Sequence, residues 1–469
     1  MRGLRLITLA AIPVLVLSAC SSSNASPTTQ SAVTNVKWFV GLGTGTSAAQ
    51  IQPQDAWVNN YNSTNKDGIK ITLDIVTNSD AFNTLKTDIA AGNAPDIIGP
   101  IGVKGRSIFK GLLLDLTSEI SKQKFDLNQY DPNVIAAIKT EGTGLVALPY
   151  SVYPGMVWYN KDIFSAAGLP NLPTKIGDQY QGKDWTYQTM GDVAAQLTVD
   201  SNGKKSTDAA FDATKITQYG LGFQWASDLK RIGDMFGSGN LVAADGKTAQ
   251  IPAAWASGLQ WYYDALQVKH IIPDATASAS AVWATGNLQS TGHVAMNLTW
   301  GWSLSSIASA PAGKANTAVK TWDIGVWPSW NGVVSAPADI DGFALSAATK
   351  NPDQAFKAMQ AITSASALDL VYGASPALLS QQAAYYAAQD TAYATTYPTN
   401  GKITWSVLAE DYKHIPAISH EAWMPDYNKA NDAANALLTK LQSTPGLNLT
   451  TELATLTTTL QADFTSNPQ

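Results

Sequence analysis

The chain has 469 residues, of which 45% are hydrophobic, and it carries a formal net charge of −6 at pH 7. This length exceeds what one hydrophobic core normally serves, so a soluble protein of two or more lobes is expected. The acidic balance and the lack of a basic run argue against nucleic acid as a partner, because phosphate neutralisation requires clustered Lys and Arg.

Residues 1–20 are expected to be a lipoprotein signal peptide. Two arginines precede an apolar run, residues 6–17, that is too short to span a membrane comfortably. The run ends in Leu-Ser-Ala-Cys, which resembles the lipobox of bacterial lipoproteins, and Cys20 is the only cysteine. We therefore expect Cys20 to be lipidated and to anchor the protein at the extracytoplasmic face of the cell membrane. Residues 21–35 are rich in Ser and Thr and are expected to form a tether.

The first folded part alternates short strands and helices. Strands are expected at 36–40, 69–76 and 94–98, with helices at 50–61 and 80–91 between them. This β-α-β-α-β order implies a parallel sheet with right-handed crossovers. A glycine-rich loop that includes Gly43 follows the first strand; it lacks the Gly-Lys-Ser/Thr ending of a phosphate loop, but its place at a strand end favours ligand contact.

A proline-containing stretch then predicts a crossing between lobes. The apolar runs Leu145–Leu148 and Met156–Tyr159 are each short enough for a buried strand, and Pro149 and Pro154 lie between them. Two strands joined by a stiff extended segment would cross between lobes, with Tyr153 beside the cleft. An ordinary edge strand is the alternative.

Beyond this crossing the elements are less regular. Helices are expected at 162–167, 185–197, 254–267, 351–364, 427–442 and 449–464, and strands at 219–225, 293–297, 322–327 and 342–346. Five apolar residues in the last helix form one stripe, which we interpret as a packing face. The chain also holds 15 Trp and 17 Tyr. Flat aromatic faces stack on sugar rings, so carbohydrate is the first ligand class to consider, although large aromatics also fill cores.

Four motifs in order resemble the sugar-binding lipoproteins of bacterial ABC importers, the maltose-binding-protein-like family. They are residues 90–97, the pair 148–150 and 158–162, residues 292–296 followed by Trp300, and the stretch from 341–342 to 355–356. The resemblance implies an α/β fold of two lobes that close about a hinge on a ligand in the interlobe cleft. Lobe 1 would comprise residues 36–149 and 321–375, and lobe 2 residues 150–320 and 376–469.

The resemblance also implies a function and candidate residues. A monomer without cofactor, metal or catalysis would capture a mono- to oligosaccharide and deliver it to an ABC permease. Trp300, Trp423 and Trp225 match aromatic positions of the family, and the remaining candidates for ligand binding are Tyr153, Trp302, Gly43, Gly99, Asp80, Asp228 and Asp341. The aspartates could accept hydrogen bonds from adjacent sugar hydroxyls, with helix capping or a solvated loop as the alternative. Tyr153 and Gly99 depart from maltose-binding protein and argue against maltose itself.

Rival functions remain open at this point. Paired carboxylates such as Asp339 and Asp341 could serve a surface glycoside hydrolase, but nothing in their spacing selects a pair. His414 and His420 lie among acidic residues, yet the HExxH metal motif is absent and Pro416 would break a helix that carried both. No serine nucleophile elbow is present. A purely adhesive lipoprotein is a third class.

Overall fold

The structure, a computed structural model, describes residues 33–139, 144–223, 228–280, 288–303, 318–373 and 375–466. The expected signal peptide, the lipidation site Cys20 and the candidate Trp225 lie outside these ranges. Within the described ranges, every helix is either too short or too polar to cross a lipid bilayer.

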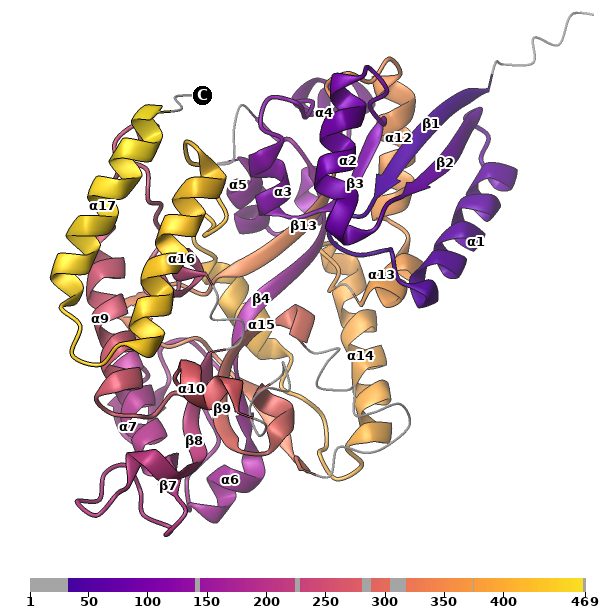
Figure 1. Cartoon of the computed structure of the whole chain (residues 1–469). Helices are drawn as coiled ribbons and strands as arrows, with labels where there is room; N and C mark the ends of the chain where they lie inside the picture. Colours follow the sequence, from indigo (N-terminus) through magenta and orange to yellow (C-terminus); the bar gives the residue numbers. More distant parts are fainter. Residues whose placement is uncertain are drawn as a thin grey trace, which may run out of the picture.

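A nine-stranded sheet runs through the molecule and is flanked by helices (Figure 1). In hydrogen-bonded order its strands are β2 (Ile69–Ile75), β1 (Thr34–Val40), β3 (Ile97–Ile101), β13 (Ala338–Leu345), β4 (Leu148–Asn160), β9 (Val294–Trp300), β8 (Ile216–Phe223) and β7 (Val199–Asp200), and β10 (Trp322–Gly325) also pairs with β4. We call β2, β1, β3 and β13 the first half of the sheet, and β9, β8 and β7 the second half.

The first half has the expected β-α-β-α-β order. β1 pairs in parallel with β2 from Thr34↔Ile69 to Val40↔Ile75, and in parallel with β3 on its other side. Its helices are α1 (Ala48–Thr64), α2 (Asn78–Ala90), α3 (Val103–Ile108), α4 (Thr117–Gln123), α5 (Pro132–Lys139), α12 (Pro352–Thr363) and α13 (Ser366–Tyr372). α12 packs on β1, β2 and β13, and α3 packs on β3 and β13.

The crossing between the halves differs from the expected pair of short strands. β4 is one strand of 13 residues, all of them buried. Its first part pairs with β13 and its second part with β9 and β10. Pro149 is accommodated because the register of β13 shifts between Asp341 and Gly342, opposite that proline. The extended backbone favoured by the two prolines therefore continues the sheet instead of interrupting it.

The second half is covered by helices that include the C-terminal pair. They are α6 (Lys161–Ala166), α7 (Tyr187–Leu197), α8 (Leu229–Asp234), α9 (Ala253–Gln267), α10 (Ala275–Ala279), α16 (Tyr427–Ser443) and α17 (Leu449–Ser466). α16 packs on α8, α9 and α17. The expected stripe of α17 is buried along its length, which confirms the packing face.

Smaller elements complete the chain. α14 (Leu379–Thr396) packs on α13 and, through Tyr393, on Trp322 of β10, and α15 (Ser406–Asp411) packs on β4. Short ribbons pair β5 (Gln179–Tyr180) with β6 (Lys183–Asp184) and β11 (Ser329–Trp330) with β12 (Val333–Val334). The 3-10 turns are η1 (Leu127–Gln129), η2 (Ala213–Lys215), η3 (Leu288–Thr291), η4 (Gly301–Ser303) and η5 (Tyr412–His414).

The hydrophobic core is shared between the halves. One buried cluster extends from Trp38 in β1 to Phe464 in α17, and β4 contributes residues along its whole length. A smaller cluster around Phe39 and Phe109 covers the other face of the first half. The length of the chain suggested separate cores; the continuous strand β4 explains why the main cluster is instead continuous.

Candidate functional site

A pocket of about 490 Å³ opens where the two halves of the sheet meet. It is lined by Leu42, Gly43, Thr44, Asn78, Phe82, Gly102, Val103, Lys104, Gly105, Tyr153, Trp302, Asp339, Ile340, Asp341, Tyr372, Gly373 and Glu421. Several of these residues follow the carboxyl ends of the parallel strands β1, β2 and β3, the edge at which α/β sheets commonly bind ligands. The crossing strands β4 and β13 also line it, through Tyr153 and through Asp339, Ile340 and Asp341.

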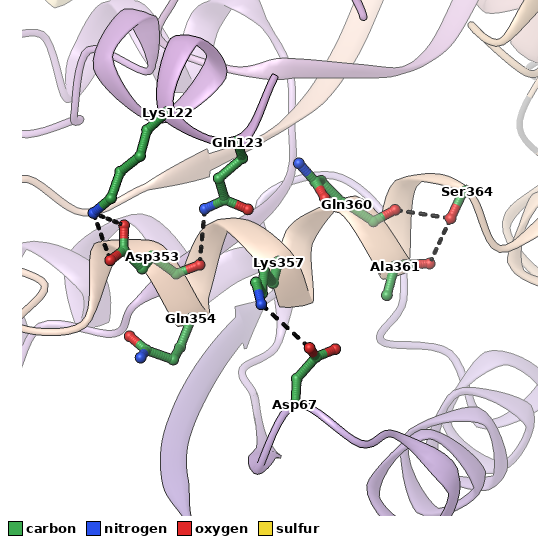
Figure 2. Close-up of a pocket in the computed structure, with 9 residues that line it drawn as sticks. All are labelled: Asp67, Lys122, Gln123, Asp353, Gln354, Lys357, Gln360, Ala361 and Ser364. Atoms are coloured by element: carbon green, nitrogen blue, oxygen red, sulfur yellow. Dashed lines mark hydrogen bonds and ion pairs between the residues drawn. The ribbon is translucent and has the colours of Figure 1, made fainter. Parts of the chain in front are cut away.

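A larger hollow of about 800 Å³ lies along α12 (Figure 2). Its charges are already paired: Lys122 of α4 contacts Asp353, and Lys357 Nζ lies 3.2 Å from Asp67 Oδ1. Exposed ion pairs of this kind contribute little stability or binding. The described residues of its wall also include no aromatic ring. The smaller pocket, with aromatic rings and converging carboxylates, is therefore the better candidate.

Three carboxylates converge on this pocket. Asp339 and Asp341 are two residues apart on β13 and so point to the same face of the sheet, and Glu421 comes from the segment before α16. Burial raises the pKa of Asp341 to about 7; Asp339 and Glu421 add to that rise, and Arg106 opposes it. Burial, followed by the charge of Asp339, likewise raises the pKa of Glu421. These groups gain most from a ligand that donates hydrogen bonds to their charged forms.

Two tryptophans at the end of β9 are arranged in parallel. The ring centroids of Trp300 and Trp302 are 6.0 Å apart and their planes differ by 4°. Trp300 is fully buried, and the guanidinium carbon of Arg231 lies 4.5 Å from its ring centroid. The turn η4 carries Trp302 back toward β4 and into the pocket wall. Trp302, not Trp300, therefore presents its ring to the pocket.

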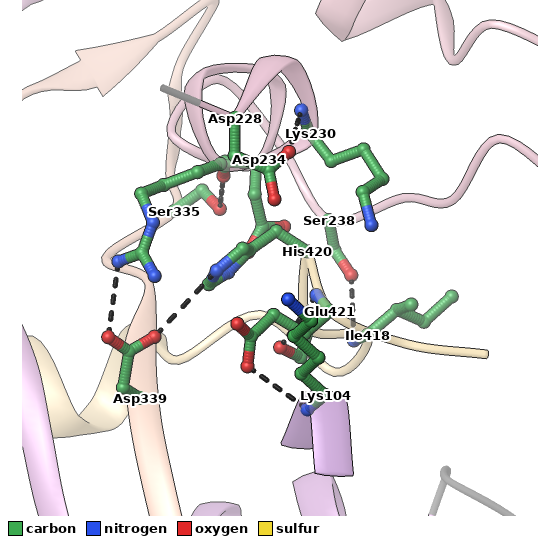
Figure 3. Close-up of polar contacts among 12 residues, drawn as sticks. Lys104, Asp228, Lys230, Asp234, Ser238, Ser335, Asp339, Ile418, His420 and Glu421 are labelled. Carbon is green, nitrogen blue, oxygen red and sulfur yellow. Dashed lines mark hydrogen bonds and ion pairs between the residues drawn. The ribbon is translucent and has the colours of Figure 1, made fainter. Parts of the chain in front are cut away.

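A buried polar cluster supports this wall from behind (Figure 3). His420 lies between two aspartates, with Nδ1 4.0 Å from Asp234 Oδ2 and Nε2 3.8 Å from Asp339 Oδ1. Burial lowers the pKa of His420 well below its usual value, and Arg231 and Lys230 act in the same direction. His420 is therefore neutral at neutral pH. Burial raises the pKa of Asp234 well above its ordinary value.

The segment 418–423, which we call the strap, contacts α3 and the turn that follows it on the first half. The hydroxyl of Ser107 donates to the carbonyl of Glu421 at 2.8 Å, and the backbone N–H of Lys104 donates to Glu421 Oε2 at 3.1 Å. Lys110 Nζ lies 3.7 Å from the ring centroid of Trp423. These contacts join the C-terminal part of the strap to the first half.

The same strap is anchored on the second half. The backbone N–H of Ile418 donates to Ser238 Oγ at 3.1 Å, and Asn240 Nδ2 donates to the carbonyl of Trp423 at 2.8 Å. The strap therefore bridges the two halves beside the pocket, with Glu421 contributing to both the bridge and the pocket wall.

Four of the expected binding residues line the pocket: Gly43, Tyr153, Trp302 and Asp341. A Cβ on Gly43 would come 3.8 Å from Asp341 Oδ2, so this glycine keeps space open next to the carboxylate. The pKa of Tyr153 is raised well above its usual value by burial and by Asp341, so its phenol is neutral and can donate a hydrogen bond.

Five others lie elsewhere in the described structure. Trp300 is in the core, and Trp423 belongs to the strap. Gly99 is buried in β3, where its carbonyl accepts a 2.7 Å hydrogen bond from Trp38 Nε1. Asp80 accepts from Thr77 Oγ1 at the start of α2, and Asp228 caps α8 by accepting from the N–H of Lys230. Asp228 thus has the capping role that was the alternative for it, whereas Asp80 is exposed in the first turn of α2.

Other pocket residues carry little signal in the sequence. Asn78, Phe82 and Lys104 follow β2 and β3 just as Gly43 follows β1, so the strand-end rule could have found them. In the sequence, Asp339 is singled out only as a candidate hydrolase carboxylate. The strand is expected to start at residue 342, after Asp339, whereas β13 begins at Ala338 and therefore includes it. Within the described ranges, no group of three His, Cys, Asp or Glu residues is arranged to hold a metal ion.

The sequence model for bacterial extracellular solute-binding proteins matches residues 45–369. Similar solved structures include UspC of M. tuberculosis, with 20% sequence identity and a TM-score of 0.68 over 92% of this chain and 100% of that one. The sugar-binding protein MalE of Xanthomonas citri has 15% identity and a TM-score of 0.67 over 92% of this chain and 98% of that one. A third is the cyclic alpha-maltosyl-1,6-maltose binding protein of Arthrobacter globiformis, with 16% identity and a TM-score of 0.65 over 92% of this chain and 100% of that one. The sequence matches none of the curated proteins compared with it.

Proposed function

The chain belongs to the bacterial extracellular solute-binding protein family, and from this premise we propose that it captures a carbohydrate in the pocket between its lobes and delivers it to an ABC permease. The observation that carries the proposal is the ring of Trp302 beside the carboxylates of Asp339 and Asp341 in one pocket. An aromatic face can stack on the C–H face of a sugar, and carboxylates accept hydrogen bonds from its hydroxyls. The sugar-binding proteins among the similar structures support the same ligand class.

Lobe closure follows from the same arrangement. The sequence predicts lobe 1 at residues 36–149 and 321–375, and lobe 2 at residues 150–320 and 376–469. Because β10 pairs with the second part of β4, we propose that β10 belongs to lobe 2 and that the chain returns to lobe 1 between β10 and β13. A ligand that contacted Asp341 from one side and Trp302 from the other would stabilise the closed form.

Attachment to the membrane is a separate proposal. The apolar run and the lipobox-like residues before Cys20 support lipid attachment at that thiol, on the extracytoplasmic face, with residues 21–35 as tether. Metabolic labelling with a palmitate analogue tests this proposal: the wild-type protein should take up label, and a Cys20→Ala variant should not. Label retained in the variant would contradict the assignment.

A thermal-shift screen of the full chain in detergent tests the binding function. Neutral mono- and oligosaccharides that bind the native state alone must raise the melting temperature. A shift with one sugar class, with the sugar recovered intact by mass spectrometry, is the expected result. A shift followed by sugar breakdown would favour the hydrolase alternative, and no shift with any sugar would overturn carbohydrate as the ligand and reopen the adhesive alternative.

A further inference from the structure

We propose that Asp339 is the positioning residue of this pocket, and that its carboxylate holds the indole ring of Trp302 in place before any ligand arrives. Asp339 Oδ2 accepts a 2.7 Å hydrogen bond from Trp302 Nε1 and a 3.1 Å bond from Arg231 Nη1. One oxygen atom therefore fixes both the edge of the indole ring and the guanidinium group.

Burial makes these contacts strong and directional. The side chains of Arg231 and Asp339 are 13% and 18% exposed, so solvent screens their ion pair only weakly. The charge of Asp339 stabilises the cationic Arg231 against the cost of its burial. A hydrogen bond to an ionised carboxylate is also about twice as strong as one between neutral groups. The indole N–H of Trp302 therefore has a strong acceptor at a fixed position.

The ring of Trp302 is fixed on a second side by Trp300. The two rings are parallel, and Trp300 is held in β9, where it pairs with Gly155 of β4. Arg231 completes the arrangement because its guanidinium group contacts the ring of Trp300 as well as Asp339. A ring held at its edge and across one face loses little conformational freedom when a ligand stacks on it, and such preorganisation raises affinity. This last step rests on the proposed function.

Asp341 provides a matched control on the same strand. It lines the same pocket two residues further along β13, and no hydrogen bond joins it to a tryptophan in the described structure. Replacing either residue takes one carboxyl group from the pocket. Only the removal of Asp339 takes away the acceptor of the Trp302 indole.

Indole N–H resonances of ¹⁵N-labelled full-length protein test the proposal without a ligand. The Trp302→Phe variant identifies the Trp302 signal by its loss. In Asp339→Ala, this signal should shift upfield, and its exchange with water should accelerate by about tenfold or more. Asp339→Asn, which keeps an acceptor oxygen but loses the charge, should give an exchange rate between those of the wild type and Asp339→Ala. Asp341→Ala should leave the signal and its exchange rate unchanged.

An unchanged Trp302 signal in Asp339→Ala, or an equal change in Asp341→Ala, would overturn the proposal. If Asp339→Ala does not fold, the wild-type protein decides: fast exchange of the Trp302 indole proton in the wild type would overturn it, and slow exchange that becomes measurably faster in Asp339→Asn would support it. Because these readouts need no sugar, their failure is distinguishable from a failure of sugar to bind.

Discussion

Lys110 and Trp423 contact each other across the two halves of the sheet, with the ammonium nitrogen 3.7 Å from the ring centroid. Lys110 follows α3 on the first half, whereas Trp423 belongs to the strap that Asn240 anchors on the second half. Burial lowers the pKa of Lys110. The pair is a cation–π contact that bridges the halves beside the pocket.

Lys110→Met should weaken this bridge. A cation–π contact at a largely exposed site contributes about 0.5–1 kcal/mol, so the fraction of bridged molecules relative to open ones should fall roughly two- to fivefold. Small-angle X-ray scattering of the sugar-free protein should then give a larger radius of gyration. Lys86→Met, which removes an exposed lysine of α2, serves as the control. Equal radii in both variants would show that the contact does not influence lobe closure.

Replacing the two parallel tryptophans should have different consequences. Trp302→Ala should weaken sugar binding by about 1–3 kcal/mol and lower the free energy of unfolding by less than Trp300→Ala does, because the ring lies in the pocket wall. Trp300→Ala should instead lower the free energy of unfolding by about 3–5 kcal/mol, since it opens a cavity in the core. Calorimetric titration and urea unfolding separate the two effects. Lost binding with intact stability in Trp300→Ala would reverse our assignment.

Asp341 should make stability depend on pH. Its pKa of about 7 in the folded protein exceeds the value near 3.9 of an unfolded chain, so the folded state binds the proton more tightly. Stability should therefore fall as pH rises from about 4 to 7, by at most about 1.4 kcal/mol per pH unit, and then level off. Arg106, Asp339 and Glu421 face this carboxyl and set the size of the shift.

The Asp341→Asn variant isolates this contribution from other buried acids. As the pH rises from 4 to 7, the unfolding free energy of the wild type should fall relative to that of the variant. Sugar binding to the wild type should strengthen over the same range, because hydroxyl donors favour the ionised carboxylate. A pH-independent difference in unfolding free energy would contradict the raised pKa.

Two glycines should differ in their tolerance of alanine. A Cβ on Gly155 of β4 would lie 2.8 Å from the Trp327 ring and 2.9 Å from the carbonyl oxygen of Pro337, so Gly155→Ala should cost about 1–3 kcal/mol of stability. A Cβ on Gly43 would come no closer than 3.5 Å to the carbonyl oxygen of Pro100. Gly43→Ala should therefore fold normally and narrow only the pocket. Comparable unfolding curves for both variants would contradict the packing described for β4.

The parts of the fold that follow from local patterns were predictable. The order of strands and helices from β1 to β3 and the packing stripe of α17 are confirmed, although β3 begins at Ile97 and not at residue 94. The strand-end rule also identifies Gly43 as a pocket residue from the amino-acid sequence alone. In contrast, α14 escapes prediction, because its mixture of Ala, Tyr, Gln and Thr shows no single apolar stripe.

The failures share a physical cause: they depend on partners distant in sequence. Pro149 remains within β4 only because β13, almost 200 residues later, shifts its register opposite it. Trp300 and Trp302 are indistinguishable by composition, and the turn η4 decides which of them reaches the pocket. The pocket role of Glu421 requires the strap to meet α3, which no local pattern could indicate.

The single strand β4 also has a consequence for how the protein reaches its native state. Side chains along a strand alternate between faces, so a pairing error of one residue would turn every side chain of β4 to the opposite face. Such an error would turn Tyr153 away from the pocket and, on the same strand, Trp158 out of its fully buried place. A misaligned chain would thus lose ligand recognition and core packing together. A chain with β4 out of register would therefore expose apolar side chains and be cleaved by proteases as an incompletely folded molecule.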